Sequence, residues 1–403
     1  MALEGKATTE RKGIAYMKSC EAAFGLAQPE DKEELLDFIN LVFSHAHCPH
    51  DFPTLLPKLY KPDLLEPQCH YVAKENGRIK ALVGSYPVTQ KVLGETLSVR
   101  TVGAVSVHPY ARNRGYMKRL MHDAVEDMRV QGVDISWLGG LRQRYQYYGY
   151  ETGGQMLRFL ITSTNLRHCL GAGYQPRCAL YPVEEGDPVL EDMRALYETQ
   201  PVHALRPADR FYVTLRNWNS RVLAIRLGET FAGYLTLARG QDGVSELVLT
   251  DPNLLTDAIA ALLASPWAKQ EVWFTAFPYE AARIRALQAL CETYRVEQVE
   301  NLQVFSFERV VRAFFQLKAA SETLPDGAMT LALNGEKLAL ECEDGQVSVT
   351  PLAADEECDL SLSHHEAVSL LFSAATAFSR SELPSFAKVW FPLPVMIQSP
   401  DQA

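Results

Sequence analysis

Cysteine pairs and long apolar runs are both missing from this sequence. Its 8 cysteines are scattered, with no C-x-x-C pair, which argues against a zinc ribbon or a disulfide scaffold. No segment approaches the ~18 to 20 uninterrupted apolar residues of a membrane-spanning helix, and residues 1–20 lack the apolar core of a signal peptide. We therefore expect reduced thiols and a cytoplasmic protein with no membrane partner.

The sequence also has fewer positively than negatively charged residues. The chain has 39 Lys and Arg against 49 Asp and Glu, a net charge of −10, so nonspecific binding of nucleic acid or of an anionic membrane is not expected. The sequence is instead rich in apolar residues, which make up 47% of its 403 positions. A single hydrophobic core stops growing near ~250 to 300 residues, so this length predicts two or three globular domains.

Residues 24–138 alternate between strand and helix patterns. The pair Asn76-Gly77, between two alternating segments, predicts a β-hairpin. The apolar stripe that follows Gly115 predicts a helix that ends at Gly132. The resulting order of strand, helix, three strands, helix and strand is an α/β layout with a ligand site where the second helix begins.

The same order of elements recurs between residues 221 and 290, which indicates an internal structural repeat. Beyond about Gln303 the pattern changes to a helix, three short strands turned at 334–335 and 344–345, and a further helix, which predicts a smaller α+β domain. The tail from Leu383 contains four prolines and many apolar residues. We expect it to be extended and docked on protein.

The strongest chemical signal is the segment VSVHPYARNRGYM, in which a strand ends and a helix begins. A pyrophosphate needs several backbone N–H donors aimed at one point, together with positive charge. A helix N-terminus preceded by Arg112 and Arg114, with Gly115 carrying no side chain, supplies both and favours acyl-CoA as the ligand. The alternative is that Gly115 marks only a tight turn and that the two arginines form a solvated face.

This stretch resembles the coenzyme A loop of the GNAT acetyltransferase superfamily, whose pattern is R/Q-x-x-G-x-G/A at the start of its third helix. Met117 replaces the last small residue, and large residues there are typical of the Eis-like (enhanced intracellular survival) branch. The resemblance implies two tandem GNAT-like domains with mixed sheets, followed by an α+β domain. The implied divisions are an N-terminal extension (1–22), a catalytic GNAT domain (23–160), a degenerate GNAT-like domain (161–298) and a sterol-carrier-protein-like domain (299–403) whose tail reaches the active site.

The resemblance also implies how acetyl-CoA binds. In GNAT enzymes the fourth strand diverges from the fifth, and its backbone N–H groups bind the thioester carbonyl. This role falls on Val105 and Val107, whose side chains can be ordinary core residues at the same time. Gly140 stands where some relatives have a serine that touches acetyl-CoA. The implied contacts with acetyl-CoA are Val105, Ser106, Val107, Arg112, Asn113, Arg114, Gly115, Tyr116 and Gly140.

Four tyrosines lie between residues 145 and 150. A tyrosine hydroxyl, with an ordinary pKa of about 10, is a suitable general acid for a departing thiolate. The Y-x-x-F-G-Y pattern of Eis-like enzymes implies that Tyr145 is catalytic, and it matches Tyr148, Gly149 and Tyr150 to the turn. The alternative is a packed aromatic cluster, which we expect for Tyr148 and Tyr150.

The Eis-like branch uses its C-terminal carboxylate as the general base, and by resemblance this role falls on Ala403. The ordinary pKa of an α-carboxyl group, ~3.3 to 3.7, suits this role only with help from burial or a bridging water. The sequence ends in SPDQA, which is polar where relatives often end in an aromatic residue. A disordered tail is therefore the alternative.

Two further segments are interpreted as noncatalytic. Residues 45–51 concentrate metal-capable side chains, but zinc sites need four ligands with distant partners. We expect a polar substrate rim there and no metal. The second repeat has Asp251 where the first has its arginines and glycine, so we expect a structural copy that cannot bind pyrophosphate.

These assignments predict an acetyl-CoA-dependent N-acetyltransferase acting on a primary amine of a small molecule or peptide, such as an aminoglycoside, a polyamine or a lysine. The alternative from another class is a noncatalytic carrier or sensor that binds an acyl-CoA or a lipid through the C-terminal domain. Variable loops contact the acceptor in this fold, and no pattern here encodes its identity. Relatives with this layout form oligomers, commonly hexamers, which implies a homo-oligomer.

Overall fold

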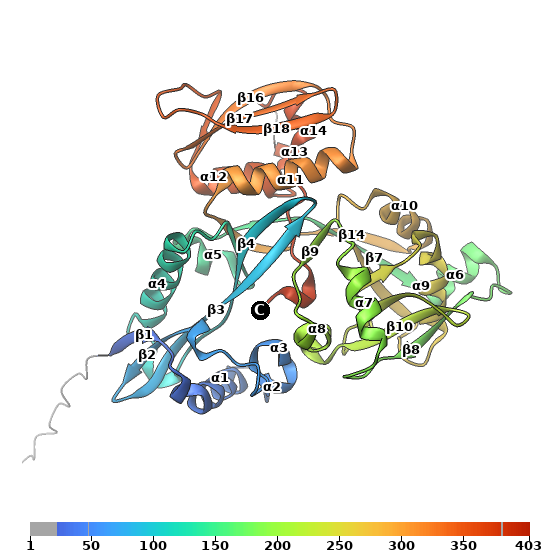
Figure 1. The fold of residues 1–403 in the computed structure, drawn as a ribbon, viewed down its shortest axis with the longest axis horizontal. Helices are drawn as coiled ribbons and strands as arrows, with labels where there is room; N and C mark the ends of the chain where they lie inside the picture. Colours follow the sequence, from blue (N-terminus) through green and yellow to red (C-terminus); the bar gives the residue numbers. More distant parts are fainter. Residues whose placement is uncertain (1–21, 47, 380–381) are drawn as a thin grey trace, which may run out of the picture.

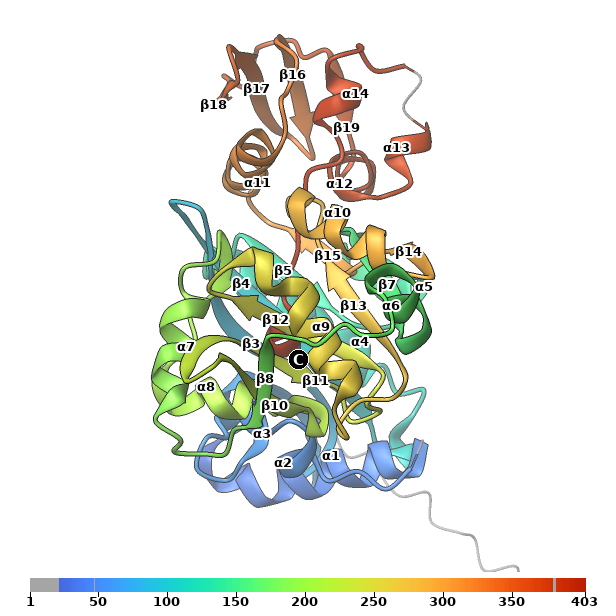
Figure 2. The ribbon, with the colours of Figure 1, turned by 90° about the vertical axis from the view of Figure 1, so that its right-hand side faces the viewer.

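The computed structural model of the chain describes residues 22–46, 48–379 and 382–403. The predicted N-terminal extension (1–22) lies outside the described residues, except for Ala22. Three β-sheets divide the described chain into a first, a second and a third unit, with the first and second side by side and the third above them (Figures 1 and 2). The mixed α/β class predicted from the sequence is confirmed.

The first unit is built on a mainly antiparallel sheet in which only β4 and β5 run parallel among the described pairs. Asn76 and Gly77 have φ angles of 50° and 75° and turn β2 into β3, as this pair predicts. In spatial order the strands are β1 (Ala23–Leu26), β2 (His70–Glu75), β3 (Arg78–Val92), β4 (Glu95–Val107), β5 (Ile135–Leu138), β15 (Glu300–Val304) and β6 (Glu151–Gly153), and β9 (Val202–Ala204) pairs with β3 outside this path.

Helices cover both faces of the first sheet. Because successive strand residues point to opposite faces, Val83 packs with the buried stripe of α4, whereas Leu82 packs with that of α1. Gly132, at a φ of 68°, follows α4 as predicted. The helices of this unit are α1 (Lys32–Ala46), α2 (Phe52–Leu55), α3 (Pro57–Tyr60), α4 (Tyr116–Val130) and α5 (Arg142–Tyr145).

The second unit has its own sheet and its own apolar core. Its strands in spatial order are β14 (Thr293–Glu297), β7 (Met156–Thr162), β13 (Glu271–Ala276), β12 (Gly243–Leu249), β11 (Thr230–Leu237), β10 (Arg221–Leu227) and β8 (Cys178–Pro182). Its helices are α6 (Ser163–Leu170), α7 (Val189–Tyr197), α8 (Ala208–Leu215), α9 (Leu255–Ala264) and α10 (Ala281–Leu290).

The first two sheets have the same topology and exchange a strand. In each, an antiparallel set of four strands meets a fifth through a parallel pair, and two antiparallel strands follow. The sixth strand of the first sheet is β15, which comes after the second unit in sequence, and the sixth strand of the second sheet is β7, which comes before it. The boundaries expected at 160 and 298 therefore do not separate the two sheets.

The third unit packs on the first through a shared core. Its main helix, α11, buries Phe314 and Phe315 in a cluster that also contains Val92 and Leu97 from the β3–β4 hairpin. The predicted turns at 334–335 and 344–345 join its three antiparallel strands. The elements are β16 (Gly327–Leu333), β17 (Glu336–Glu343), β18 (Gln346–Pro351), β19 (Leu360–Leu362), α11 (Phe307–Ser321), α12 (His364–Phe372), α13 (Thr376–Ser379) and α14 (Ala387–Trp390).

The tail that follows α14 runs back from the third unit and ends between the first and second units, where the C-terminus is marked in Figure 1. Its apolar residues are buried, including Leu393, Val395 and Ile397. After α14 the tail is therefore extended and docked on protein, as its composition predicts, whereas residues 387–390 of the segment from Leu383 are helical and depart from that prediction.

Candidate active site

The centre of the site is the point where β4 leaves β5. Their parallel pairing ends at Val102 and Leu138, and β4 then carries a bulge at Ala104, where φ is 51°. The His108 N–H donates to Lys80 of β3. Since successive N–H groups of a strand point to opposite sides, the N–H of Val107 points toward the space that β5 has left.

Residues 105–107 supply both donors and a buried hydroxyl. By the same alternation, the N–H of Val105 points to the same side as that of Val107, while both side chains pack with the α4 core. Ser106 lies opposite Leu82 and faces the other side of the sheet. Its buried hydroxyl has no hydrogen-bond partner among the described residues. The strand thus offers free polar groups at the position expected for the thioester.

The start of α4 has the geometry of an anion site. Asn113 and Gly115 have φ angles of 64° and 79°, and a β-carbon on Gly115 would meet nothing within 4 Å. The N–H groups of the first helical turn therefore open onto solvent. A surface hollow of about 440 Å³ follows, lined by Gly115, Lys118, Arg119, His122 and Asp123. The free space and donors fit a pyrophosphate.

The two arginines of this loop differ in their surroundings. Arg112 is exposed and makes no hydrogen bond or ion pair within the described part of the chain. Arg114 is held by Glu75 at 2.5 Å and by the Tyr110 carbonyl at 3.2 Å. The Tyr116 hydroxyl also donates to Glu75, and hydrogen bonds from Tyr116 and Arg114 lower the pKa of this carboxyl group. Glu75, which no pattern in the sequence singles out, thus orients the loop.

Tyr145 is buried next to this region, with 5% of its surface exposed. Burial raises the pKa of its hydroxyl, and Arg144 opposes the shift. A β-carbon on Gly140 would lie 2.8 Å from Cε2 of Tyr145, and the φ of Gly140 is 131°. The serine found here in some resembled enzymes has no room, so its contact with acetyl-CoA is not available in this chain.

The neighbouring tyrosines have different environments. Tyr150 is fully buried and its hydroxyl lies 2.7 Å from that of Ser136, which agrees with the packing role expected for it. Tyr148 is partly buried in the same core, whereas Tyr147 is 88% exposed. Among the four tyrosines, Tyr145 combines burial with a position beside the end of β5.

The segment that carries Tyr145 is held from two sides. Arg142, one turn earlier, forms a bidentate ion pair with buried Glu151 of β6. From the third unit, Nε2 of His365 donates to the Gln146 carbonyl at 3.1 Å. These contacts fix the turn independently of the tyrosine ring.

Two residues of β15 complete the end of β5. The Asn301 side-chain amide donates to the carbonyls of Leu138 and Gly140, at 3.0 and 2.9 Å. A carboxylate oxygen of Glu300 lies 3.1 Å from where a β-carbon of Gly139 would stand. Neither residue could be predicted from the sequence, because both follow the second unit and no local pattern places them beside β5.

The last residue, Ala403, lies against β4. A β-carbon on Gly103 would lie 2.9 Å from the Ala403 β-carbon and 3.3 Å from its carboxyl carbon. Lys58 of α3 donates to the carbonyls of Pro400 and Gln402 at 2.7 and 2.6 Å. The two residues expected to be catalytic therefore lie at neighbouring strands. Ala403 lies against β4, and Tyr145 follows the end of β5.

Two ionisable side chains lie near this end of the chain, buried Lys58 and partly buried Glu300. Burial lowers the pKa of Lys58 to about 7, although Asp401 opposes the shift. Burial raises the pKa of Glu300 to about 7, and Lys58 opposes this shift. Among the described residues, the Glu300 carboxylate makes no hydrogen bond or ion pair. Burial therefore moves the pKa values of both groups toward neutral pH.

The second unit differs at both corresponding positions. Asp251 uses its carboxylate to cap the start of the helical segment, accepting from the Asn253 N–H at 2.9 Å. Arg283, held by Glu280, donates to the Leu247 carbonyl of β12 where this strand has left β13. A side chain of the unit itself therefore enters the divergence that is open in the first unit.

The segment 45–51 is organised by local contacts. The His50 N–H donates to Ser44 at 2.8 Å and its ring stacks on Phe52, while His47 lies outside the described residues. Within the described ranges, no three His, Cys, Asp or Glu side chains form a group that could hold a metal ion. No helix in those ranges is long and apolar enough to cross a membrane.

Comparison with known proteins identifies the first unit. Residues 24–153 match the family model described as an acetyltransferase (GNAT) domain. These residues are a GNAT acetyltransferase domain, and the chain is an acyltransferase. The match contains β4, the α4 loop and Tyr145, which are the elements that build the site. No curated protein sequence matches the chain.

Solved structures with the same fold span almost the whole chain. A GCN5-related N-acetyltransferase from Kribbella flavida is 16% identical, with a TM-score of 0.62. The match covers 93% of this chain and 97% of the Kribbella chain. A probable N-acyltransferase from Enterococcus faecalis V583 is 15% identical, with a TM-score of 0.65 and coverages of 94% and 97%. Eis1 from Mycobacterium abscessus is 14% identical, with a TM-score of 0.62 and coverages of 95% and 99%.

Proposed function

We propose that this chain transfers the acetyl group of acetyl-CoA to a primary amine of an aminoglycoside-, polyamine- or lysine-like acceptor. The observation that carries this proposal is the divergence of β4 from β5 beside the glycine-capped start of α4. It combines free strand N–H groups with an open helix N-terminus, as a thioester linked to a pyrophosphate requires. Acetyl-CoA supplies the activated acetyl group, and no metal takes part in the proposal.

The residues act in a defined order. The N–H groups of Val105 and Val107 stabilise the carbonyl oxygen as the amine attacks in a ternary complex. The carboxyl group of Ala403 accepts a proton from the amine. Tyr145 gives a proton to the sulfur that leaves. The loop from Arg112 to Tyr116 holds the phosphates, and Gly140 leaves room for the Tyr145 ring.

A cationic amine fits the charges of this region. The Glu300 carboxylate makes no hydrogen bond or ion pair among the described residues, and the net charge of the chain is −10. A bound ammonium group would lower the pKa of Glu300 and keep its carboxylate charged. This electrostatic match favours polyamine- or aminoglycoside-like acceptors over neutral amines.

The roles of the second and third units, and the oligomeric state, are proposed from the resemblance to Eis-like enzymes. The second unit is a degenerate GNAT-like domain, the third is a sterol-carrier-protein-like domain, and the protein is a cytoplasmic homo-oligomer such as a hexamer. Structural likeness to Eis1 over 95% of the chain supports the arrangement of the three units. The mass of the purified protein in solution tests the oligomer.

The activity is tested by following thiol release from acetyl-CoA with a panel of polyamines, aminoglycosides and lysine peptides. Turnover with any of these, and its loss in Tyr145→Phe, is the expected result. Saturable binding of fatty ligands with no turnover across the panel would instead identify a carrier.

A further inference from the structure

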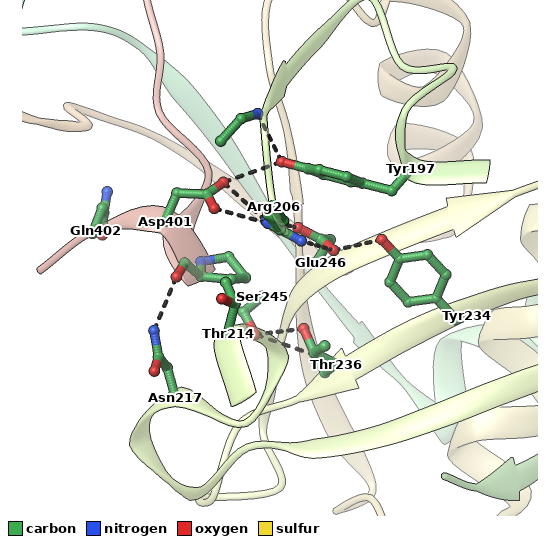
Figure 3. A network of polar contacts seen from close by, with 12 residues as sticks. Tyr197, Arg206, Thr214, Asn217, Tyr234, Thr236, Ser245, Glu246, Asp401 and Gln402 are labelled. Atoms are coloured by element: carbon green, nitrogen blue, oxygen red, sulfur yellow. Dashed lines mark hydrogen bonds and ion pairs between the residues drawn. The ribbon is translucent and has the colours of Figure 1, made fainter. Parts of the chain in front are cut away.

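Arg206 joins the second unit to the end of the chain. It lies between β9 and α8, and its side chain is only 3% exposed. The guanidinium donates to Glu246 of β12 at 2.9 and 2.7 Å and to Asp401 of the tail at 2.8 and 2.9 Å (Figure 3). The two carboxylates are 2% and 5% exposed. One cation therefore binds two buried anions from distant parts of the sequence.

The network around Arg206 leaves little freedom. Tyr197 lies under the guanidinium, with its ring centre 3.9 Å from Cζ, and its hydroxyl donates to Asp401 at 3.2 Å. The Tyr234 hydroxyl donates to Glu246 at 2.6 Å. Buried carboxylates are tolerated only when they are paired and hydrogen-bonded. Asp401 is held in place because the second unit supplies these partners.

The contacts on either side of Asp401 fix the direction of the backbone. Lys58 of the first unit donates to the carbonyls of both neighbours, Pro400 and Gln402, and Asn217 of the second unit also donates to the Pro400 carbonyl at 2.9 Å. Two residues later, Ala403 meets Gly103 of β4. The position of Ala403 thus depends on side chains from both units.

We propose that Arg206 is a positioning residue, and that the second unit serves as the dock that holds Ala403 against β4. The inference deepens the proposed function and rests on it, since it gives the second unit a role in placing the base. In the second unit, Asp251 stands where the first unit has its cofactor loop, and Arg283 enters the strand divergence. Through Arg206, β12 and the segment before α8 instead bind Asp401.

Asp401→Asn tests the dock by removing the charge of the tail carboxylate. The charge of Arg206 stays paired, because Glu246 remains its partner. The matched control is Asp257→Asn, which weakens the ion pair between Arg177 and buried Asp257 elsewhere in the second unit. The measurement is release of Ala403 by a carboxypeptidase from proteins of residues 1–403. Because a charge-assisted hydrogen bond contributes ~1.5 to 3 kcal/mol, we expect release at least about tenfold faster from Asp401→Asn. The control should match the unchanged protein, and equal rates in all three proteins would overturn the dock.

Kinetics then separates this inference from the proposed function. With the best acceptor, Asp401→Asn should lower kcat about tenfold or more, with the KM for acetyl-CoA unchanged and partial rescue by formate. Faster release of Ala403 with an unchanged kcat would support the dock and contradict Ala403 as the base. Gly103→Ala provides a second variant outside the charge network, since its added methyl group would lie 2.9 Å from the Ala403 β-carbon. It should also speed release, and an unchanged rate would contradict the placement of Ala403.

Discussion

The ring of Tyr145 lies over the backbone of Gly140, with Cε2 2.8 Å from the position of a β-carbon on that glycine. Any side chain at position 140 would push the ring away, and the φ of 131° also disfavours other residues. Gly140 thus determines where the Tyr145 hydroxyl can lie relative to the end of β5. The catalytic proposal depends on this placement.

Tyr145→Phe removes the proposed proton donor and keeps the ring over Gly140. We expect kcat to fall by ~10² to 10⁴-fold with little change in acetyl-CoA binding, because general acid catalysis contributes that much. Steady-state kinetics on a good acceptor, under conditions where chemistry limits the rate, provides the measurement. Tyr148→Phe is the control and should keep its activity. A Tyr145→Phe protein with full kcat would rule out the general acid.

Arg112→Ala and Arg114→Ala should each weaken binding of coenzyme A. Each removes a charge-assisted hydrogen bond of ~1.5 to 3 kcal/mol, or about 10- to 150-fold in affinity, and the loss of Arg114 also leaves Glu75 without its cation near the phosphates. Titration calorimetry measures the effect. Arg129→Ala, at the far end of α4, is the control, and unchanged affinity in both loop variants would contradict the phosphate site.

Coenzyme A should bind with a stoichiometry of one per chain. In the second unit, Asp251 would face the phosphates with negative charge, and Arg283 enters the strand divergence. The same calorimetric titration gives the number of sites. A value of two would show that the second unit keeps a cofactor site.

Glu300→Gln should change how stability depends on pH. Burial raises the pKa of Glu300 from 4.5 to about 7, so between these values the folded protein holds a proton that the unfolded chain releases. The free energy of unfolding should therefore fall as pH rises from 4.5 to 7, by about 1 to 3 kcal/mol relative to Glu300→Gln.

Urea denaturation at several pH values measures this difference, and parallel curves for the two proteins would contradict the shift. The measurements stay below pH 7, because above this pH Lys58 changes the free energy of unfolding in the opposite direction. The pKa of Lys58 is lowered from 10.5 to about 7, so between pH 7 and 10.5 the unfolded chain holds the extra proton. Stability should rise with pH in that range.

Local features of the site were predictable from the sequence. Gly115 ends a loop and begins an amphipathic helix, and both signals lie within a few residues of each other, so the start of α4 was placed correctly. Asn76-Gly77 likewise determined its hairpin. Such features depend on φ angles and on periodicity, which the adjacent residues themselves encode.

Contacts between distant segments were not predictable in this way. Lys58 and Arg206 look like ordinary surface charges in sequence, and only the fold buries them beside distant partners, as the bonds from Lys58 to Pro400 and from Arg206 to Asp401 show. The exchange of β7 and β15 was missed for the same reason. Both strands have ordinary strand patterns, and which sheet receives them is decided by pairing across the whole chain.

The exchanged strand β15 has a consequence for how the protein is made. On the ribosome, the acetyltransferase domain of residues 24–153 emerges first, yet the open edge of β5 stays unpaired until residues 300–304 have been synthesised. An unpaired edge is a site of aggregation. A gene cut after this domain would therefore encode a sheet with a missing strand, and any piece that completes this sheet must extend through Val304.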